Sequence, residues 1–137
     1  MELVRKTIGR YVEPTGPEWA QILPCWRAFA FNRGATITAA RRVEQYFYIV
    51  DQGVQRLSFP HDGTDVCVGF SYNGSWTGDY TSFVSRSAAR FDVVALTDSV
   101  LVGISYSALQ RLFQALKVME RFGRLILEEL LAGRATR

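Results

Sequence analysis

Residues 46–59 have the sequence Tyr46-Phe47-Tyr48-Ile49-Val50-Asp51-Gln52-Gly53-Val54-Gln55-Arg56-Leu57-Ser58-Phe59. The first part is rich in aromatic and β-branched residues, and the last part alternates apolar and polar residues, which is typical of strands. Asp51-Gln52-Gly53 between them has the composition of a turn. The stretch therefore predicts two strands, at 46–50 and 54–59, that pair as a hairpin.

Further short strands are indicated on both sides of this stretch by the same alternation, with turn residues between them. They are expected at 27–31, 36–38, 65–70, 91–96 and 100–104. The last two should form a second hairpin around Thr97-Asp98-Ser99. Short strands at regular spacing favour a sandwich, barrel or roll over a fold of alternating strands and helices.

Both ends of the chain have helical periodicity instead. A first helix is expected over 2–12, and Thr15 and Glu18 resemble a capping box that starts a short second helix. Near the other end, helices are expected from 107 to about 116 and from about 118 to 131. The sequence thus predicts one domain, 1–137, with N-terminal helices (1–26), a β-roll (27–105) and C-terminal helices (106–133).

Composition is consistent with an ordinary globular domain. The 137 residues are 48% apolar and 21% charged, with a net charge of +3 spread along the chain, which favours a solvated surface over a nucleic-acid-binding patch. No signal peptide and no membrane-length apolar stretch is present. Cys25 and Cys67 make neither a disulfide framework nor a zinc motif. We therefore expect a cytoplasmic protein that does not associate with membranes.

Catalytic motifs are missing from the sequence. His61 is the single histidine and lies in a Pro-His-Asp-Gly turn, so a metal site and a Ser-His-Asp triad are not expected. The sequence has no GxSxG, GxGxxG or P-loop motif. We expect neither an enzyme nor a metal centre, and an enzyme on a cupin-like roll is the weakest hypothesis.

The order of elements resembles the sensor domain of the Crp/Fnr (cAMP receptor protein) family of regulators. Five stretches carry the resemblance: 32–37, 46–57, 78–80, 93–102 and 120–125. It implies a mainly β fold with flanking helices, namely a double-stranded β-helix (jelly roll) of the cyclic-nucleotide-binding type with a C-terminal amphipathic helix.

The resemblance also places the start of a phosphate-binding cassette at Gly78. In the family the cassette begins Gly-Glu and ends with Arg and a small hydroxyl residue; the Glu binds the ribose hydroxyl and the Arg neutralises the cyclic phosphate. Here Asp79 replaces the Glu, and the arginine position, counted without gaps, falls on Ala89 and the hydroxyl position on Arg90. An extended chain shifted by one residue turns its side chains to the opposite face.

An earlier Arg-Ser pair, Arg86-Ser87, is an alternative end of the cassette. The candidate ligand-binding residues are Gly78, Asp79, Tyr80, Arg86, Ser87 and Arg90. The implied ligand is a cyclic nucleotide such as cAMP or another small anion. Because the pattern is degenerate, an unidentified or absent ligand is expected over an ordinary cyclic nucleotide.

The C-terminal helix implies a homodimer in this family. Its apolar stripe contains Met119, Phe122, Ile126 and Leu130, and Gly123 would let a second backbone approach. A helix folded back on its own domain is the alternative.

The implied function is the ligand-sensing and dimerisation domain of a transcription regulator. DNA would be contacted only through a helix-turn-helix domain, which we do not find in this sequence. The chain would then be either a truncated sensor domain of a longer regulator or a natural stand-alone domain. The alternative function is an interaction domain that dimerises and binds no nucleotide.

Overall fold

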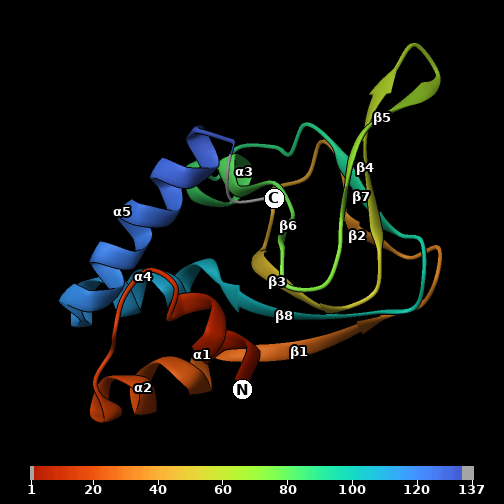
Figure 1. Cartoon of the computed structure of the whole chain (residues 1–137). Coiled ribbons are helices and arrows are strands. Elements are labelled where there is room, and N and C mark those ends of the chain that lie inside the picture. The colour runs from red at the N-terminus through yellow and green to blue at the C-terminus, as the bar shows by residue number, and fades with distance from the viewer. Residues whose placement is uncertain (1, 134–137) are drawn as a thin grey trace.

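Two four-stranded antiparallel sheets form the body of the chain in the computed structural model, which describes residues 2–133 (Figure 1). The strands are β1 (Trp26–Phe31), β2 (Thr36–Thr38), β3 (Tyr46–Gln52), β4 (Gln55–His61), β5 (Thr64–Ser71), β6 (Trp76–Thr77), β7 (Asp92–Ala95) and β8 (Ser99–Ser105). One sheet has the order β1-β8-β3-β6 and the other β2-β7-β4-β5. The predicted mainly β fold is confirmed, although the two-residue strand β6 was not expected.

Both strand pairings predicted from the turns are wrong. β3 pairs with β6 and β8, whereas β4 pairs with β5 and β7, so Asp51-Gln52-Gly53 leads from one sheet to the other. The turn between β7 and β8 does the same. The two turns pack together, since Thr97 Oγ1 accepts a hydrogen bond from Val54 N (3.0 Å) and Val54 O accepts one from Leu96 N (2.8 Å). They form one corner of the roll.

The true hairpin joins β4 and β5. Its turn residues Asp62 and Gly63 both have positive φ, 48° and 79°, which suits a tight two-residue connection between antiparallel strands. Figure 1 shows this hairpin projecting from the roll, away from the helices. His61 lies at its tip and is exposed, as expected for a turn histidine.

The helices are α1 (Glu2–Ile8), α2 (Gly16–Ile22), α3 (Tyr80–Ser85), α4 (Tyr106–Ala115) and α5 (Lys117–Leu131), with a 3₁₀ turn over Leu23–Cys25. α1 ends four residues before the predicted residue 12, and α3 was not predicted. The capping box of Thr15 and Glu18 is present at the start of α2. Within residues 2–133, no helix has both the length and the apolar content needed to cross a bilayer.

The main core lies between the helices and one face of the sheet that contains β3 and β8. α5 contributes Met119, Phe122 and Ile126, whose side chains are 0–1% exposed within a single chain. Leu130 packs at the edge of the same core. These are the residues predicted to face a second copy. The structure therefore places the predicted dimer stripe in the chain's own core, which is the folded-back alternative.

Gly123 serves the same intramolecular packing. An ideal Cβ on this residue would lie 2.8 Å from the ring of Phe113 in α4, so the glycine admits a neighbouring side chain of its own chain. Tyr11, after α1, packs edge-on against Phe122 and donates a hydrogen bond to Glu129 Oε2 (2.9 Å). Contacts from α4 and from Tyr11 thus hold α5 against the rest of the domain.

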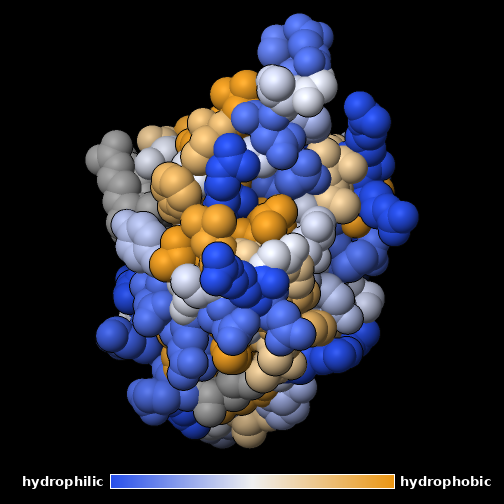
Figure 2. Space-filling view, turned by 90° about the vertical axis from the view of Figure 1, so that its right-hand side faces the viewer, coloured by the Kyte–Doolittle hydropathy of each residue, from blue (hydrophilic) through white to orange (hydrophobic). Residues whose placement is uncertain are grey.

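The other sheet turns one face toward solvent. Exposed apolar side chains on and beside it are Phe59, Val66, Val68, Phe70, Tyr72 and Leu96. Figure 2 shows hydrophobic side chains on this side of the molecule interrupted by hydrophilic ones. The face is a mixed surface with small apolar patches, which is common on soluble domains.

Replacing Gly53 by alanine tests the corner. Gly53 has φ +105°, and a Cβ there would lie 2.8 Å from Asp98 O and 2.5 Å from Ser99 Oγ. Gly34 has φ +88° with nothing within 4 Å of its Cβ position, so it is a matched control. We expect Gly34→Ala to cost about 1 kcal/mol of unfolding free energy for the backbone alone, and Gly53→Ala at least about 2 kcal/mol more for the clash.

Urea unfolding of both purified variants measures the difference. Equal losses would show that the two turns do not pack against each other as described.

Candidate functional site

The cassette predicted from the sequence begins directly after β6 and contains α3. Asp79 caps this helix: Oδ1 accepts a hydrogen bond from Ser82 N (3.1 Å). Its other oxygen, Oδ2, accepts one from Arg90 N (3.0 Å). The side chain is 4% exposed. Both oxygens of Asp79 thus bind backbone N–H groups of the cassette itself and connect its beginning to its end.

A side chain at position 78 would clash with a neighbouring carboxyl group, so this position requires glycine. The residue has φ +105°, and an ideal Cβ would lie 2.9 Å from Oε1 of Glu44. Any larger residue would combine an unfavourable backbone conformation with a steric clash. The glycine lets the cassette pass close to Glu44.

Glu44 is a buried residue of the site that the sequence analysis missed. It is 5% exposed, its Oε1 accepts a hydrogen bond from Thr38 Oγ1 (3.0 Å), and its backbone N donates one to Ser82 Oγ (2.9 Å). Burial raises the pKa of Glu44 to about 7; the hydrogen bond from Thr38 opposes this rise, and the nearby Asp79 adds to it. The available signal was its period-two spacing with Tyr46 and Tyr48, which turns alternate side chains to one face.

Arg86 is occupied by structural contacts. It has φ +59° at the end of α3, and its Nη1 donates hydrogen bonds to the carbonyls of Glu44 and Phe83, both at 3.0 Å. Its guanidinium lies 4.5 Å from the ring centre of Tyr106 at the start of α4. Arg86 therefore connects α3 to the chain before β3 and to α4.

The neighbouring candidates Ser87 and Tyr80 also have partners. Ser87 O accepts a hydrogen bond from Ser82 Oγ, and the Ser87 hydroxyl lies 2.6 Å from that of Ser85. Tyr80 packs against Phe47 with ring centres 4.6 Å apart, and burial raises its pKa to about 12. The Ser87 hydroxyl thus has a partner, and the Tyr80 ring is packed against another aromatic ring.

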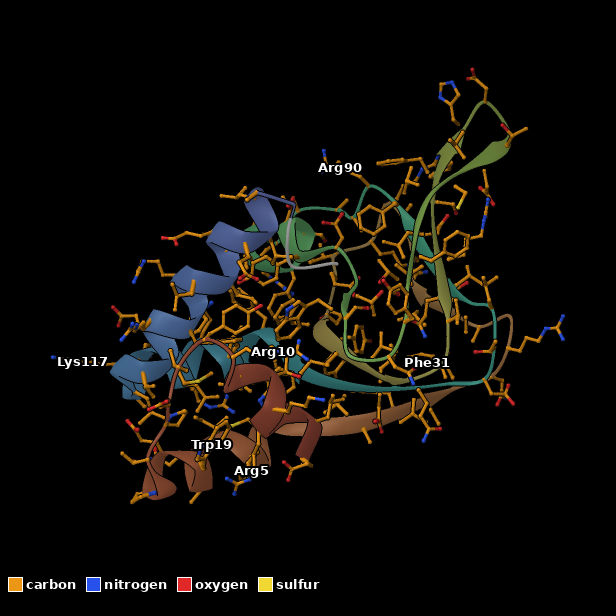
Figure 3. The ribbon with its side chains drawn as sticks, in the orientation of Figure 1. Arg5, Arg10, Trp19, Phe31, Arg90 and Lys117 are labelled. Carbon is orange, nitrogen blue, oxygen red and sulfur yellow. The ribbon has the colours of Figure 1, made fainter. Side chains whose placement is uncertain are left out.

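Arg90 is exposed, while Ala89 beside it is buried. Figure 3 shows Arg90 at the upper edge of the molecule, and its side chain makes no hydrogen bond or ion pair in the described part of the chain. Main-chain bonds fix this alternation, because Arg41 N donates to Ala89 O and Ala89 N to Arg42 O, both at 2.8 Å. The position that faces inward thus holds a methyl group, and the guanidinium one residue later faces outward.

The family model for the cyclic nucleotide-binding domain matches residues 28–115. The chain belongs to this family. A search of curated proteins finds no match. The family assignment of the chain thus rests on the match to the family model.

Solved structures of the same architecture include regulators. A cyclic nucleotide-binding domain from Methylobacillus flagellatus has a TM-score of 0.82 at 14% identity, over 96% of this chain and 76% of the other. The sensor domain of the regulator DNR from Pseudomonas aeruginosa has 0.75 at 14%, over 96% and 85%. The catabolite activator protein of Thermus thermophilus has 0.74 at 19%, over 87% and 56%. This chain thus spans little more than half the length of the Thermus protein, and at these identities the likeness shows the fold.

The candidate cassette of this cyclic nucleotide-binding domain differs from the family pattern described above in the chemistry of its side chains. The carboxylate after the glycine is one methylene shorter and caps a helix, and the arginine side chain points outward. A pocket of about 310 Å³ lies next to the cassette, and all its lining residues come from 36–48. They are Thr36, Ile37, Ala39, Arg42, Val43, Glu44, Gln45, Tyr46 and Tyr48.

Glu44 gives the domain a pH-dependent stability. The pKa of this carboxyl is about 7 in the folded chain and 4.5 when unperturbed, so between these values the folded state holds a proton that the unfolded state releases. The contribution is complete below pH 4.5 and is lost as the pH rises to about 7. We expect a loss on the order of 3 kcal/mol across this window.

Urea unfolding between pH 4.5 and 8 measures this loss, with Glu44→Gln expected to show a flatter profile. Glu120→Gln, an exposed carboxyl on α5, is the control and should keep the wild-type profile. A Glu44→Gln profile as steep as that of the wild type would contradict the assignment.

Proposed function

We propose that this chain is the ligand-sensing and dimerisation domain of a Crp/Fnr-like transcription regulator in the cytoplasm. The family match and the likeness to regulator sensor domains support this proposal. In such regulators a helix-turn-helix domain contacts the DNA, and we place that domain outside residues 2–133. Both cysteines are free thiols, which is consistent with a reducing compartment.

The effector, we infer, is not an ordinary cyclic nucleotide bound in the family manner. The observation that carries this is the state of Asp79, whose two oxygens already accept hydrogen bonds from Ser82 N and Arg90 N. A ribose hydroxyl would have to displace one of them. A cyclic phosphate at the inner end of the cassette would meet Ala89 in place of a guanidinium, and an unpaired buried anion is costly.

Binding measurements with cAMP and cGMP test this inference. At about 1 mM nucleotide, which corresponds to a weak affinity, we expect no rise in the melting temperature of the purified chain and no heat of binding by calorimetry. Stabilisation by several degrees that Arg90→Ala abolishes would overturn the inference and place the phosphate at Arg90.

The dimer, in this proposal, uses the outer face of α5. Met119, Phe122 and Ile126 are taken up by the core, whereas Leu127 and Leu131 are 41% and 80% exposed. Beside them Arg124 and Glu128 form an exposed ion pair at 2.9 Å. An exposed apolar strip flanked by charges on a long helix suits a two-fold contact with the same strip of another copy.

Leu127→Glu tests the dimer by light scattering after gel filtration. We expect a wild-type dimer at micromolar concentration and at least about tenfold weaker association in the variant, because two buried carboxylates would face each other. Leu96 is exposed to nearly the same extent, 40%, but lies on the opposite part of the roll, so Leu96→Glu should remain dimeric. A monomeric wild type, or disruption by Leu96→Glu alone, would refute the α5 dimer.

A dimerising domain that binds no ligand is the second candidate. It is favoured by the self-contained cassette, in which Asp79, Arg86 and Ser87 all bind groups of their own chain. A thermal-shift screen of small molecules separates the two candidates, since a sensor must have at least one stabilising ligand.

A further inference from the structure

The pocket of about 310 Å³ beside the cassette is lined by two buried polar side chains. Glu44 and Tyr48, from the chain before β3 and from β3 itself, are each 5% exposed. Ile37 and Val43 add apolar walls, and Tyr46 and Tyr48 add aromatic ones, with ring centres 5.9 Å apart. The volume is at the lower end of the range for small-molecule sites.

Glu44 and Tyr48 each have a polar atom without a partner. Glu44 Oε1 accepts from Thr38, but within residues 2–133 neither Glu44 Oε2 nor Tyr48 Oη makes a hydrogen bond. Among the described residues, the side-chain polar atom that is fully buried without a hydrogen-bond partner is Trp26 Nε1. Glu44 Oε2 and Tyr48 Oη are therefore not fully buried. Because both residues line the pocket, a ligand held in it would lie beside these two side chains.

Arg42 brings a positive charge to the same pocket. Its side chain is exposed, and the ion pairs of the described residues, His61–Asp62 and Arg124–Glu128, do not include it. Its backbone is held in place by the hydrogen bond from Ala89 N to Arg42 O. The lining of the pocket therefore includes a buried acid, a buried phenol and an exposed arginine.

The other charged groups around Glu44 are already engaged. Asp79 binds two backbone N–H groups, and Arg86 donates to the carbonyl of Glu44 and not to its carboxyl. Arg27 stacks on the ring of Phe29, 4.6 Å from its centre, and lies 6.0 Å from that of Tyr46. Within residues 2–133, no cation is hydrogen-bonded to or ion-paired with the free carboxyl oxygen.

We propose that this pocket binds a small organic zwitterion of amino-acid size, with its ammonium group at Glu44 and Tyr48 and its carboxylate at Arg42. An ammonium group supplies the donors that Glu44 Oε2 lacks, and aromatic faces also attract cations. Guanidinium pairs well with carboxylate. A purely anionic ligand would bring a second negative charge to Glu44. This proposal deepens the proposed function, because it names the class of effector that the sensor would detect.

A ligand series of increasing length tests the proposal. The probes are the straight-chain amino acids from glycine to 6-aminohexanoate together with L-leucine, and butylamine and butyrate serve as single-charge controls. Calorimetry on the full chain at neutral pH should find at least one zwitterion with a dissociation constant below about 1 mM and at least about tenfold weaker binding of both controls.

Variants assign the two ends of the ligand. Glu44→Gln and Arg42→Gln should each weaken the best zwitterion at least about tenfold, while Arg41→Gln, the adjacent arginine that does not line the pocket, should not. Binding should also release protons from wild type but not from Glu44→Gln, because the ammonium group favours the ionised carboxyl. Buffers of different ionisation enthalpy reveal this release.

The possible failures have different meanings. Absence of binding by every zwitterion, or binding that Glu44→Gln leaves unchanged in a variant that still unfolds cooperatively, overturns this inference. A stabilising molecule of another class in the same assay also overturns it but supports the sensor function. A chain that no molecule stabilises, although it dimerises through Leu127, fails as a sensor altogether.

Discussion

The buried carboxyl of Glu44 is the constraint on which the shape of the site depends. Thr38 of β2 donates to its Oε1, Gly78 lies against the same oxygen without a side chain, and its backbone N–H and C=O bind Ser82 of α3 and Arg86. Burying a carboxyl among so few donors is costly and keeps it partly protonated near neutrality. β2, β3 and the cassette are each positioned around this one group.

The sequence predicted the elements of the fold better than their connections. Alternating apolar residues determine which segments are strands, and the strand at 36–38 has the expected bounds. The same alternation cannot distinguish a hairpin from a corner, because both need a turn after an apolar run. At Gly53 the chain forms a corner because the residue packs against Asp98 and Ser99, which are distant in sequence. α3 was missed because its start depends on a capping carboxylate, Asp79, rather than on a long apolar period.

The sequence predicted part of the geometry of the candidate cassette but not its hydrogen bonds. The shift of the arginine by one residue does turn Arg90 outward and Ala89 inward, while the assignment of Gly78 and Asp79 to a ligand site stays a prediction. What the sequence could not show is that Asp79 binds the backbone at both ends of the cassette. The amphipathic stripe of α5 had a similar ambiguity, because packing on its own sheet and packing on a second copy require the same apolar spacing. Met119, Phe122 and Ile126 are 0–1% exposed in the single chain, so the stripe packs on its own domain.

The contacts around Glu44 continue to the helix at the proposed dimer interface. Arg86 binds the carbonyl of Glu44 and lies over Tyr106, the first residue of α4. α4 in turn places Phe113 against Gly123 of α5. Because these groups are in direct contact, a ligand that displaces Glu44 must also be accommodated by Arg86 and by the start of α4. In the proposed sensor the cassette would therefore need no phosphate ligand, because α3 and Arg86 connect the small pocket to the C-terminal helices.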